Sequence, residues 1–527
     1  MKYPIGIQTF DQIIEYGFVY VDKTDMVYSL ATEGKVYCLT RPRRFGKSLL
    51  LSTFKAYFEG KRALFQGLKI EALETDWHSH TVFHFDFNGI DYTLPNALRA
   101  KLEGYLSRWE ADFGISKGPD FNLASRFEQI IKAAALKSGR AVVVLIDEYD
   151  KPLLDALEKD ANLLEENREI LKAFYGVFKQ ADADIRFVFL TGVTKFSQVS
   201  VFSGFNQPID ISMVRKYEAI CGITEPELYE RFGDSISELA QVYGYSEAEV
   251  RYELKKYYDG YHFSEGMTDI YNPFSLLNAF YAMAIRDYWF TTGTPSYLIR
   301  LMNHFQEGID ALSGKYYELD AFINYKADVE YPLPMIYQSG YLTIKDYDRR
   351  RNTFLLDFPN NEVKTGFLTM VASNYLQTQE NVGNLAKNLS FALEDGELDV
   401  FRKLLTAFLA SIPYSMRRKS NEPERERYFQ YTFYLLLRLM SVYTVFVERV
   451  QSEGRVDCIV ETPKFVYIFE FKLDGSAQEA LQQIQDKGYA RPYEAERRNV
   501  NLIGVNFSSE TGTISDWVEI TVPSQIF

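Results

Sequence analysis

In segment 1–205, short runs of β-branched and aromatic residues alternate with amphipathic stretches. The stretches 47–58 and 162–179 carry apolar residues three or four positions apart, which is the spacing of one helix face. Strands that alternate with helices are typical of a parallel sheet covered by helices. The pattern therefore predicts an α/β fold with helices on both faces of the sheet. The predicted strands are residues 36–40, 81–87, 141–146 and 185–190.

Helical periodicity dominates the middle of the chain, interrupted by a small β-hairpin excursion near its end. The last part alternates again: helices are predicted at 424–440 and 476–489, with strands between and after them. This pattern predicts a second α/β domain at the C-terminus. The predicted segments are 1–205, a mostly helical middle region at 206–365, a helical connector at 366–412, and the last domain at 413–527.

The first predicted strand runs directly into Arg41-Pro-Arg-Arg-Phe-Gly-Lys-Ser48, and an amphipathic helix follows at once. In a strand–loop–helix of this kind, backbone N–H groups and the helix N-terminus hold the phosphates of a nucleotide. Lys47 would reach the β- and γ-phosphates of ATP, and Ser48 would ligate Mg²⁺. The candidate nucleotide-binding residues are Arg43, Arg44, Phe45, Gly46, Lys47 and Ser48.

Two features of this loop leave alternatives open. Arg41 stands where the pattern G-x-x-x-x-G-K-[ST] has its first glycine, so an ordinary helix N-terminus is the competing interpretation. Arg43 and Arg44 would either add positive charge beside the phosphates or form a solvated basic loop.

A strand that reads as fully buried, residues 141–146, ends in Asp147 and Glu148. Ligands bind at the carboxyl ends of strands in open α/β sheets. Asp147 would hold the Mg²⁺ water shell there, and Glu148 would polarise the attacking water as a base. The alternative is a solvated acidic turn. Thr191, after the strand 185–190, would hydrogen-bond the γ-phosphate or simply cap its strand.

Asp457, Glu470 and Lys472 are predicted to meet across a hairpin in the last segment. Glu470 and Lys472 are separated by one residue, so they point to the same face of a strand, opposite to Phe469 and Phe471. Two carboxylates and an ammonium can bind one or two Mg²⁺ ions and activate a water against a phosphodiester. The alternative is a surface salt bridge between Glu470 and Lys472.

Gln483 lies on the helix predicted after these strands. It would orient the scissile phosphate or the water, or it would lie on a solvated helix face.

With these motifs, the chain resembles the bacterial family of AAA-ATPase-like proteins with a C-terminal PD-(D/E)XK nuclease-like domain. The arginine-rich loop without its first glycine is typical of that family, so Arg41 supports the resemblance. The resemblance spans nearly the whole chain. It rests on Tyr20-Val-Asp-Lys-Thr24, the 41–48 loop, Leu145-Ile-Asp-Glu-Tyr-Asp150, Gln338-Ser-Gly-Tyr-Leu-Thr343, Gly454-Arg-Val-Asp457 and Glu470-Phe-Lys472.

The resemblance implies a P-loop NTPase sheet followed by a restriction-endonuclease-like domain. It implies that the 41–48 loop is a Walker A motif and that Asp147 and Glu148 form a Walker B motif. It also implies a nuclease-like site at Asp457, Glu470, Lys472 and Gln483. Glu426 is the first candidate for a further carboxylate of that site, in competition with Glu422, Glu424 and Glu448. No arginine finger can be assigned.

Charge and cysteine content narrow the choice of partners. The 58 Lys and Arg against 72 Asp and Glu give a net charge of −14, which argues against non-specific coating of nucleic acid or anionic membrane. Any contact with DNA or RNA must therefore be local. Cys38, Cys221 and Cys458 lie far apart without a C-x-x-C pair, so they predict neither a disulfide framework nor a zinc site.

The apolar segments of the chain favour a cytoplasmic protein without a membrane partner. The first residues hold no apolar run of the length of a signal-peptide core. The segment 431–447 is interrupted by Arg438 and is too short to span a bilayer. A homo-oligomer is compatible with the sequence but cannot be derived from it.

Two hypotheses of different classes follow from these motifs. The first is an enzyme that binds and hydrolyses ATP and uses Mg²⁺ to cleave DNA or RNA under nucleotide control. The second is a nucleotide-switched regulatory or nucleic-acid-binding module that does not cleave, which the acidic balance favours because it gives little electrostatic affinity for nucleic acid.

Overall fold

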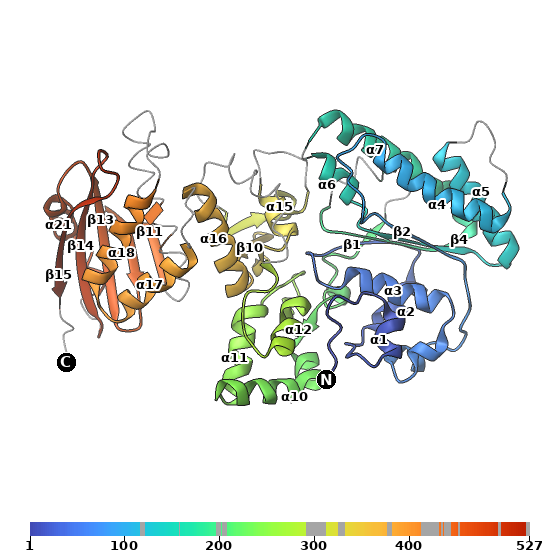
Figure 1. Cartoon of the computed structure of the whole chain (residues 1–527), viewed down its shortest axis with the longest axis horizontal. Helices are drawn as coiled ribbons and strands as arrows, with labels where there is room; N and C mark the ends of the chain where they lie inside the picture. Colours follow the sequence, from blue (N-terminus) through green and yellow to red (C-terminus); the bar gives the residue numbers. More distant parts are fainter. Residues whose placement is uncertain are drawn as a thin grey trace. The chain divides into compact units, whose positions relative to one another are not determined.

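The chain folds into two compact units, Met1–Val363 and Lys364–Phe527 (Figure 1). The sequence boundaries at residues 205 and 412 stay predictions. This computed structural model describes residues 1–115, 122–157, 159–195, 202, 208–290, 312–324, 332–376, 382–412, 432–433, 436, 444–451, 454–493 and 497–522.

The first unit contains a five-stranded sheet with the order β2-β3-β4-β1-β5. Every neighbouring pair in it is parallel, as the alternation of strands and helices predicts. The four strands predicted from the sequence are all present, and the short β5 was not predicted. The strands are β1 (Val36–Thr40), β2 (Val82–Asp86), β3 (Val142–Asp147), β4 (Ile185–Gly192) and β5 (Ile209–Asp210).

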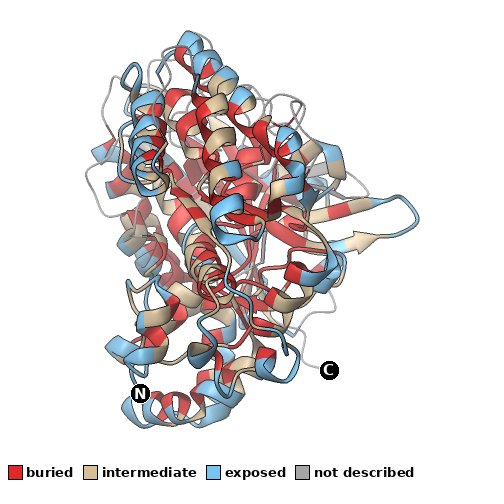
Figure 2. Cartoon of the chain, turned by 90° about the vertical axis from the view of Figure 1, so that its right-hand side faces the viewer, coloured by how far each residue is buried: buried red, intermediate tan, exposed pale blue. Residues whose placement is uncertain are grey.

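Helices cover both faces of this sheet (Figure 1). Every residue of β3 is buried, as expected for a strand that is covered on both sides. In Figure 2 the buried residues gather toward the middle of the view, while the helices carry exposed residues on their outer sides. On one face lie α1 (Phe10–Glu15), α2 (Thr24–Glu33) and α3 (Lys47–Phe58), and on the other α4 (Ala97–Phe113), α5 (Leu123–Ser138) and α7 (Ala161–Tyr175).

Phenylalanine rings form much of the packing between sheet and helices. Phe187 and Phe189 of β4 lie 5.1 and 4.8 Å from the ring of Phe54 on α3. On the other face, Phe85 of β2 lies 5.2 Å from Phe127 of α5. These aromatic residues are therefore core material. The predicted helix 162–179 is broken at Gly176, where α7 ends and α8 (Val177–Gln180) begins.

The part of the first unit after β5 is mostly helical, as predicted. The two longest helices described there begin with capping boxes, Thr224 with Glu227 and Ser246 with Glu249. A hairpin of β9 (Thr343–Asp348) and β10 (Thr353–Asp357) forms a three-stranded sheet with β8 (Lys315–Glu318). The helices are α10 (Glu225–Tyr243), α11 (Glu247–Tyr258), α12 (Pro273–Ala282), α14 (Leu319–Ile323) and α15 (Leu333–Gln338).

The second unit holds a five-stranded mixed sheet with the order β11-β12-β13-β14-β15. β13 and β14 are parallel, and α21 (Ala477–Asp486) connects them as the crossover helix. The edge strand β15 was not predicted, and the helix predicted at 424–440 lies almost entirely outside the described residues. The strands are β11 (Thr444–Gln451), β12 (Gly454–Glu461), β13 (Phe465–Leu473), β14 (Asn499–Phe507) and β15 (Ile514–Val522).

Three helices, α16 (Asn361–Leu376), α17 (Val382–Glu394) and α18 (Leu398–Ser411), precede this sheet in the sequence. α16 begins in the first unit and continues into the second. The two faces of β13 differ as predicted. Phe469 lies 6.1 Å from Phe401 of α18, whereas Ile468 packs with Leu481 of α21 on the opposite face.

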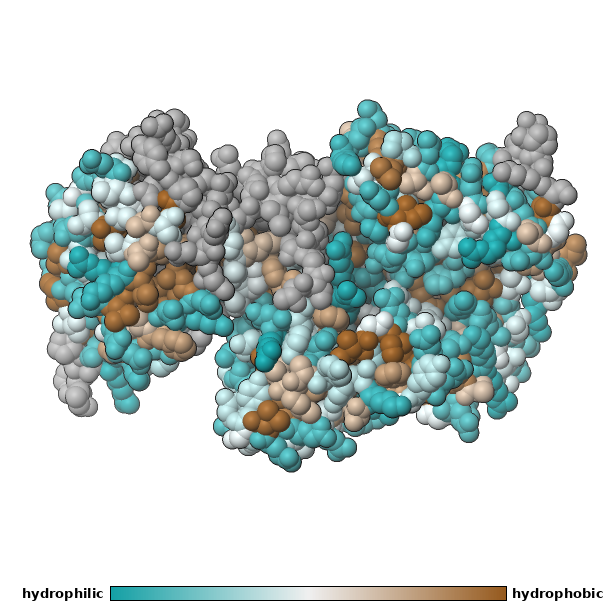
Figure 3. Space-filling model, in the orientation of Figure 1, coloured by the Kyte–Doolittle hydropathy of each residue, from teal (hydrophilic) through white to brown (hydrophobic). Residues whose placement is uncertain are grey.

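The visible surface of the first unit is mostly hydrophilic, with small separate apolar patches (Figure 3). Apolar side chains gather on the second unit over α17 and α18, where Phe391 and Val400 are exposed. Among the described residues, no helix has both the length and the apolar character that a membrane span requires.

A close approach between α21 and β14 depends on Gly504. A Cβ atom at this position would lie 2.1 Å from the carbonyl oxygen of Ala477 and 2.7 Å from the backbone nitrogen of Leu481. We expect Gly504→Ala to lower the free energy of unfolding by about 1–3 kcal/mol, because the backbone of β14 and that of α21 must move apart to make room for the methyl group. Urea unfolding measures the change. Gly104→Ala on α4, where a Cβ meets nothing within 4 Å, is the control; an equal effect of both variants would contradict the argument.

Candidate functional site

The loop between β1 and α3 has the backbone of a phosphate-binding loop at its end. Gly46 has a φ of 93°, in the left-handed region, and a Cβ there would meet nothing within 4 Å. Arg44 is also left-handed, with a φ of 69°. α3 begins at the next residue, Lys47, so its first N–H groups open onto this loop.

The Lys47 side chain is buried within its own loop. Its ammonium donates to the carbonyl oxygens of Arg41 and Pro42, each at 3.0 Å. These two bonds hold the charged end of the side chain against the loop. The exposed side chains of Arg43 and Arg44 are the other positive charges of the motif. The donor set therefore suits an anionic phosphate group.

Arg41, at the position of the missing glycine, is turned inward and only 1% exposed. Its guanidinium donates to the carbonyl oxygens of Ser212 (2.8 Å) and Glu218 (3.3 Å), and it lies 4.0 Å from the centre of the Phe263 ring. Burial lowers the pKa of this guanidinium from its ordinary value. Arg41 thus anchors the start of the loop to the segment after β5.

The Phe45 side chain points into an aromatic cluster rather than toward the loop opening. Its ring lies 4.8 Å from that of Tyr261 and 5.5 Å from that of Phe263, both nearly edge-on. Only the backbone of Phe45 is left for a nucleotide. Its side chain instead fastens the loop to the segment after α11.

Asp147 and Thr191 come together at the carboxyl ends of β3 and β4. Both are buried, and the Thr191 hydroxyl donates to Asp147 Oδ1 at 2.6 Å. Thr191 therefore orients the carboxylate in this structure. Its contact with a γ-phosphate stays a prediction, as does the Mg²⁺ role of Asp147 and Ser48.

Glu148 follows Asp147 with a φ of 51°, a strained conformation for a residue with a side chain. Burial raises the pKa of its carboxyl group, and the positive charges of Lys47 and Arg43 partly offset this rise. Glu148 thus lies within electrostatic range of the phosphate loop. Raised carboxyl pKa values and backbone strain are both typical of catalytic positions.

Asp150 is a buried residue whose role sequence reasoning missed. Its Oδ2 accepts hydrogen bonds from the N–H groups of Val193 (3.0 Å) and Thr194 (2.6 Å), and from the Thr194 hydroxyl (2.8 Å). Burial raises the pKa of this carboxyl group. Asp150 thereby fixes the loop after β4. The sequence offered one indication of this role, because Asp150 ends the motif Leu145–Asp150 on which the family resemblance rests.

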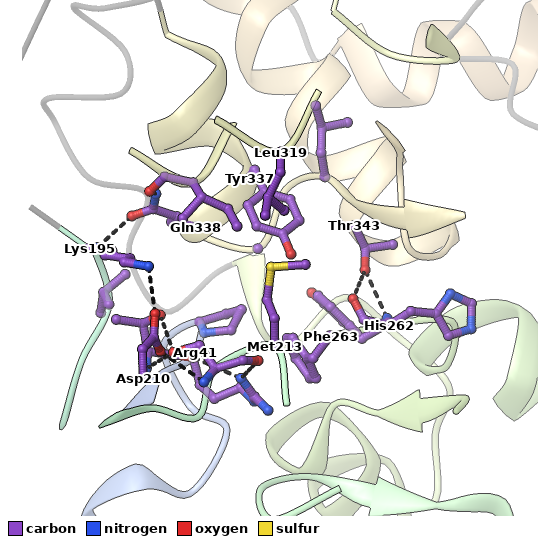
Figure 4. Close-up of a pocket in the computed structure, with 18 of the residues that line it drawn as sticks. Arg41, Lys195, Asp210, Met213, His262, Phe263, Leu319, Tyr337, Gln338 and Thr343 are labelled. Atoms are coloured by element: carbon purple, nitrogen blue, oxygen red, sulfur yellow. Dashed lines mark hydrogen bonds and ion pairs between the residues drawn. The ribbon is translucent and has the colours of Figure 1, made fainter. Parts of the chain in front are cut away.

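A cavity of about 250 Å³ lies beside the start of the phosphate loop (Figure 4). Lys195 and Asp210 form an ion pair at 2.6 Å in its wall. Gln338 accepts the Lys195 N–H at 2.6 Å, and a Cβ on Gly340 would lie 2.6 Å from the Pro42 side chain. The 338–343 string therefore packs against the phosphate loop and the segment after β4.

In the second unit, Asp457 and Glu470 are cross-strand neighbours. The register that pairs Cys458 with Phe469 places them opposite each other on β12 and β13. Asp457 Oδ2 accepts the Phe471 N–H at 2.8 Å, and the Asp457 N–H donates to Glu470 Oε2 at 3.4 Å. The two carboxylates therefore meet on the face of the sheet that α21 covers.

Gln483 links the other two predicted residues of this site. Its amide nitrogen donates to Glu470 Oε1, and its amide oxygen accepts a hydrogen bond from the Lys472 ammonium at 2.7 Å. Lys472 forms no ion pair with Glu470, although both residues are described. The cluster is thus a chain from Lys472 through Gln483 to Glu470, rather than the surface salt bridge of the alternative interpretation.

Burial, and then the nearby Asp457 carboxylate, raises the pKa of Glu470 to about 8. Because a neighbouring carboxylate contributes to the raised pKa of Glu470, a divalent cation bound between the two would relieve their repulsion. No group of three or more His, Cys, Asp and Glu side chains that could hold a metal ion occurs in the part of the chain that the structure describes. Mg²⁺ commonly binds through one or two carboxylates and keeps several waters, so the pair fits it.

The further carboxylate of this site stays a prediction. Glu422, Glu424, Glu426 and the side chain of Glu448 lie outside the described part of the structure.

Comparisons with known proteins agree with this architecture. Residues 4–202 match a family model described as a predicted AAA-ATPase, and residues 424–517 match the PD-(D/E)XK nuclease superfamily. The chain is 36% identical over 526 residues to an uncharacterized protein in the vnfD 5′ region of Azotobacter chroococcum mcd 1, covering 98% of both chains. The chain belongs to this family, in which a predicted AAA-ATPase domain precedes a PD-(D/E)XK nuclease superfamily domain.

Among solved structures, Cdc6p from Pyrobaculum aerophilum shares 12% identity at a TM-score of 0.25, over 66% of this chain and 90% of that one. The Aeropyrum pernix ORC1 protein, solved in complex with DNA, shares 11% at a TM-score of 0.22, over 89% and 92%. Similarity at these TM-scores carries no argument about this chain.

The raised pKa of Glu470 makes the stability of the metal-free protein depend on pH. The folded state keeps a proton that the unfolded chain, with a carboxyl pKa near 4.3, has released. The contribution of Glu470 to the free energy of unfolding is therefore fully present below about pH 4. This contribution decreases as the pH rises toward about 8, by at most about 1.4 kcal/mol per pH unit.

Urea unfolding in EDTA between pH 5.5 and 8.5 tests this dependence by comparing wild type with Glu470→Gln. The difference between the two isolates Glu470, because all other carboxyl groups are common to both. The exposed Glu510→Gln variant serves as the control. Parallel pH profiles for wild type and Glu470→Gln would contradict the assignment.

Proposed function

We propose that the protein binds and hydrolyses ATP at the 41–48 loop and cleaves a nucleic-acid phosphodiester at the Asp457–Glu470 site under nucleotide control. The observation that carries the proposal is the linked cluster of the second unit, where Asp457, Glu470, Gln483 and Lys472 lie on one side of the sheet. An adventitious ion pair would not join four such residues from two strands and a helix.

At the nucleotide site, the loop residues have distinct roles in this proposal. Lys47 moves its ammonium from the carbonyl oxygens of Arg41 and Pro42 toward the phosphates, where it neutralises charge. The N–H groups at the start of α3 bind the phosphate oxygens. Ser48 and Asp147 hold Mg²⁺, with Thr191 keeping the Asp147 carboxylate in place. The cation neutralises negative charge on the phosphates when it is bound.

Glu148 is the base in this proposal. Its carboxyl group lies in electrostatic range of Lys47, and its raised pKa favours acceptance of a proton from the attacking water. Asp150 supports it indirectly, because it fixes the loop after β4 next to Thr191.

At the second site, Asp457 and Glu470 hold the metal ion in this proposal, and Lys472 stabilises negative charge that develops on the phosphodiester. Gln483 positions both neighbours through its amide group. When bound there, Mg²⁺ would supply Lewis-acid activation of a water and positive charge beside the scissile phosphate. The proton must leave Glu470 before the cation binds, so cation affinity increases with pH.

The second candidate function is a nucleotide-switched regulatory or nucleic-acid-binding module that does not cleave. The net charge of −14 favours it, because a chain of this charge attracts a polyanion only weakly. Nucleotide-dependent binding of DNA or RNA without cleavage under any divalent metal would support this alternative.

Removal of the Lys47 ammonium tests the nucleotide site. We expect Lys47→Ala to weaken ATP binding by about tenfold to a hundredfold, the cost of a hydrogen bond to a charged group, and to abolish turnover. Calorimetry and phosphate release measure both effects. Lys55→Ala, on the same helix with a side chain 43% exposed, is the matched control. Unchanged ATP binding by Lys47→Ala would exclude this loop as the site.

The nuclease assignment is tested with Lys472→Ala and Glu470→Ala in a plasmid-nicking assay with Mg²⁺. We expect each variant to lose about a hundredfold or more in rate, because charge stabilisation and metal binding are both required. Lys464→Ala, exposed in the turn between β12 and β13, is the control. If both variants nick the plasmid as wild type does, the activity does not arise at this site.

A further inference from the structure

A tryptophan far from the phosphate loop in sequence holds one of its backbone carbonyls. The indole Nε1 of Trp289 donates to the carbonyl oxygen of Arg43 at 3.0 Å. The Trp289 side chain is only 6% exposed, so this bond is shielded from competing water. Arg43 follows Pro42 in the arginine-rich stretch of the loop, at the point where the chain turns toward α3.

This bond sets the direction of a neighbouring N–H group. In a trans peptide the carbonyl and the N–H of the next residue point in opposite directions, and no cis peptide occurs in the described part of the chain. Capture of the Arg43 carbonyl by Trp289 therefore turns the Arg44 N–H away from the indole. Successive N–H groups that face one way form the concavity that binds an anion.

Trp289 is in turn held by a buried carboxylate. Glu362 Oε1 accepts the backbone N–H groups of Tyr288 (2.5 Å) and Trp289 (2.6 Å). Glu362 is 1% exposed and lies in the first turn of α16. One chain of hydrogen bonds thus runs from the Arg43 carbonyl through Trp289 to the helix whose later residues belong to the second unit.

We propose that Trp289 is a positioning residue for phosphate binding and that its contact with Glu362 transmits the nucleotide state of the loop to α16. This inference rests on the proposed ATP site. Phosphate binding tightens the loop around the Arg44 and Gly46 N–H groups, which moves the Arg43 carbonyl and hence the indole that is bonded to it. Because the Trp289 N–H group is hydrogen-bonded to Glu362, a shift of Trp289 then displaces the Glu362 carboxylate and with it the first turn of α16.

The first test compares ATP affinity between two Trp→Phe variants. Trp289→Phe removes the bond to Arg43 and keeps an aromatic ring. Trp77→Phe makes the same change where the indole nitrogen has no hydrogen-bond partner. Calorimetry is expected to show about two- to tenfold weaker ATP binding for Trp289→Phe only, the effect of one lost hydrogen bond. Equal affinities in wild type and Trp289→Phe, at equal thermal stability without nucleotide, would overturn the positioning role.

The second test follows the indole itself and does not require Trp289→Phe to fold. The full chain, whose four tryptophans are labelled with 5-fluorotryptophan, is titrated with MgATP by fluorine NMR. Trp→Phe variants at positions 77, 109 and 517 assign three resonances, so the fourth belongs to Trp289. We expect the Trp289 resonance to shift and that of Trp77 to stay. A static Trp289 resonance while calorimetry shows binding would overturn the relay.

A double-mutant cycle tests the link to Glu362. Because Glu362 is inferred to act on the loop through Trp289, Glu362→Ala should weaken ATP binding in wild type but not further in Trp289→Phe. Additive losses would show that Glu362 acts by another route and would overturn the transmission step. Absence of ATP binding by wild type, in contrast, would contradict the proposed function itself.

Discussion

The phosphate loop keeps its shape because donors capture its carbonyl oxygens. Lys47 takes those of Arg41 and Pro42, and Trp289 takes that of Arg43. Backbone carbonyls that are bonded on one side leave the following N–H groups turned to the other, which is the requirement of an anion site. At the position where the phosphate-loop pattern has a glycine, the buried guanidinium of Arg41 anchors the start of the loop.

In the second unit, the candidate site depends on the register between two strands. Antiparallel pairing of β12 with β13 sets Asp457 opposite Glu470, and the same pairing makes their charges repel. Burial, and then this repulsion from Asp457, raises the pKa of Glu470. A fold rarely keeps such a repulsion in its interior unless a ligand relieves it, and carboxylates of this kind cluster at functional sites.

Several features were correctly predicted from local pattern: the parallel sheet of the first unit, the start of α3 after the loop, and the opposite faces of Glu470 and Phe469 on β13. The short β5 and the edge strand β15 were missed, because a brief strand or a half-exposed edge leaves little periodic signal. Phe45 was predicted to bind the nucleotide, yet its side chain packs in an aromatic cluster of the core. The buried Arg41, for which the sequence predicted no contact, anchors the loop. A sequence motif predicts where the backbone of a residue lies, whereas the direction of its side chain depends on the residues that pack around it.

The amino-acid sequence alone determined what depends on near neighbours: the alternation of strands and helices, the strand–loop–helix with its Gly-Lys-Ser, and the Glu-x-Lys spacing on one strand. Tertiary structure decided the contacts between distant segments, such as Trp289 with Arg43 and Gln338 with Lys195. A periodic pattern extends over a few residues only, and these partners are separated by more than a hundred positions. They meet because elements that are remote in sequence pack together. The spacing of residues along the chain does not predict which backbone carbonyl an indole will bind.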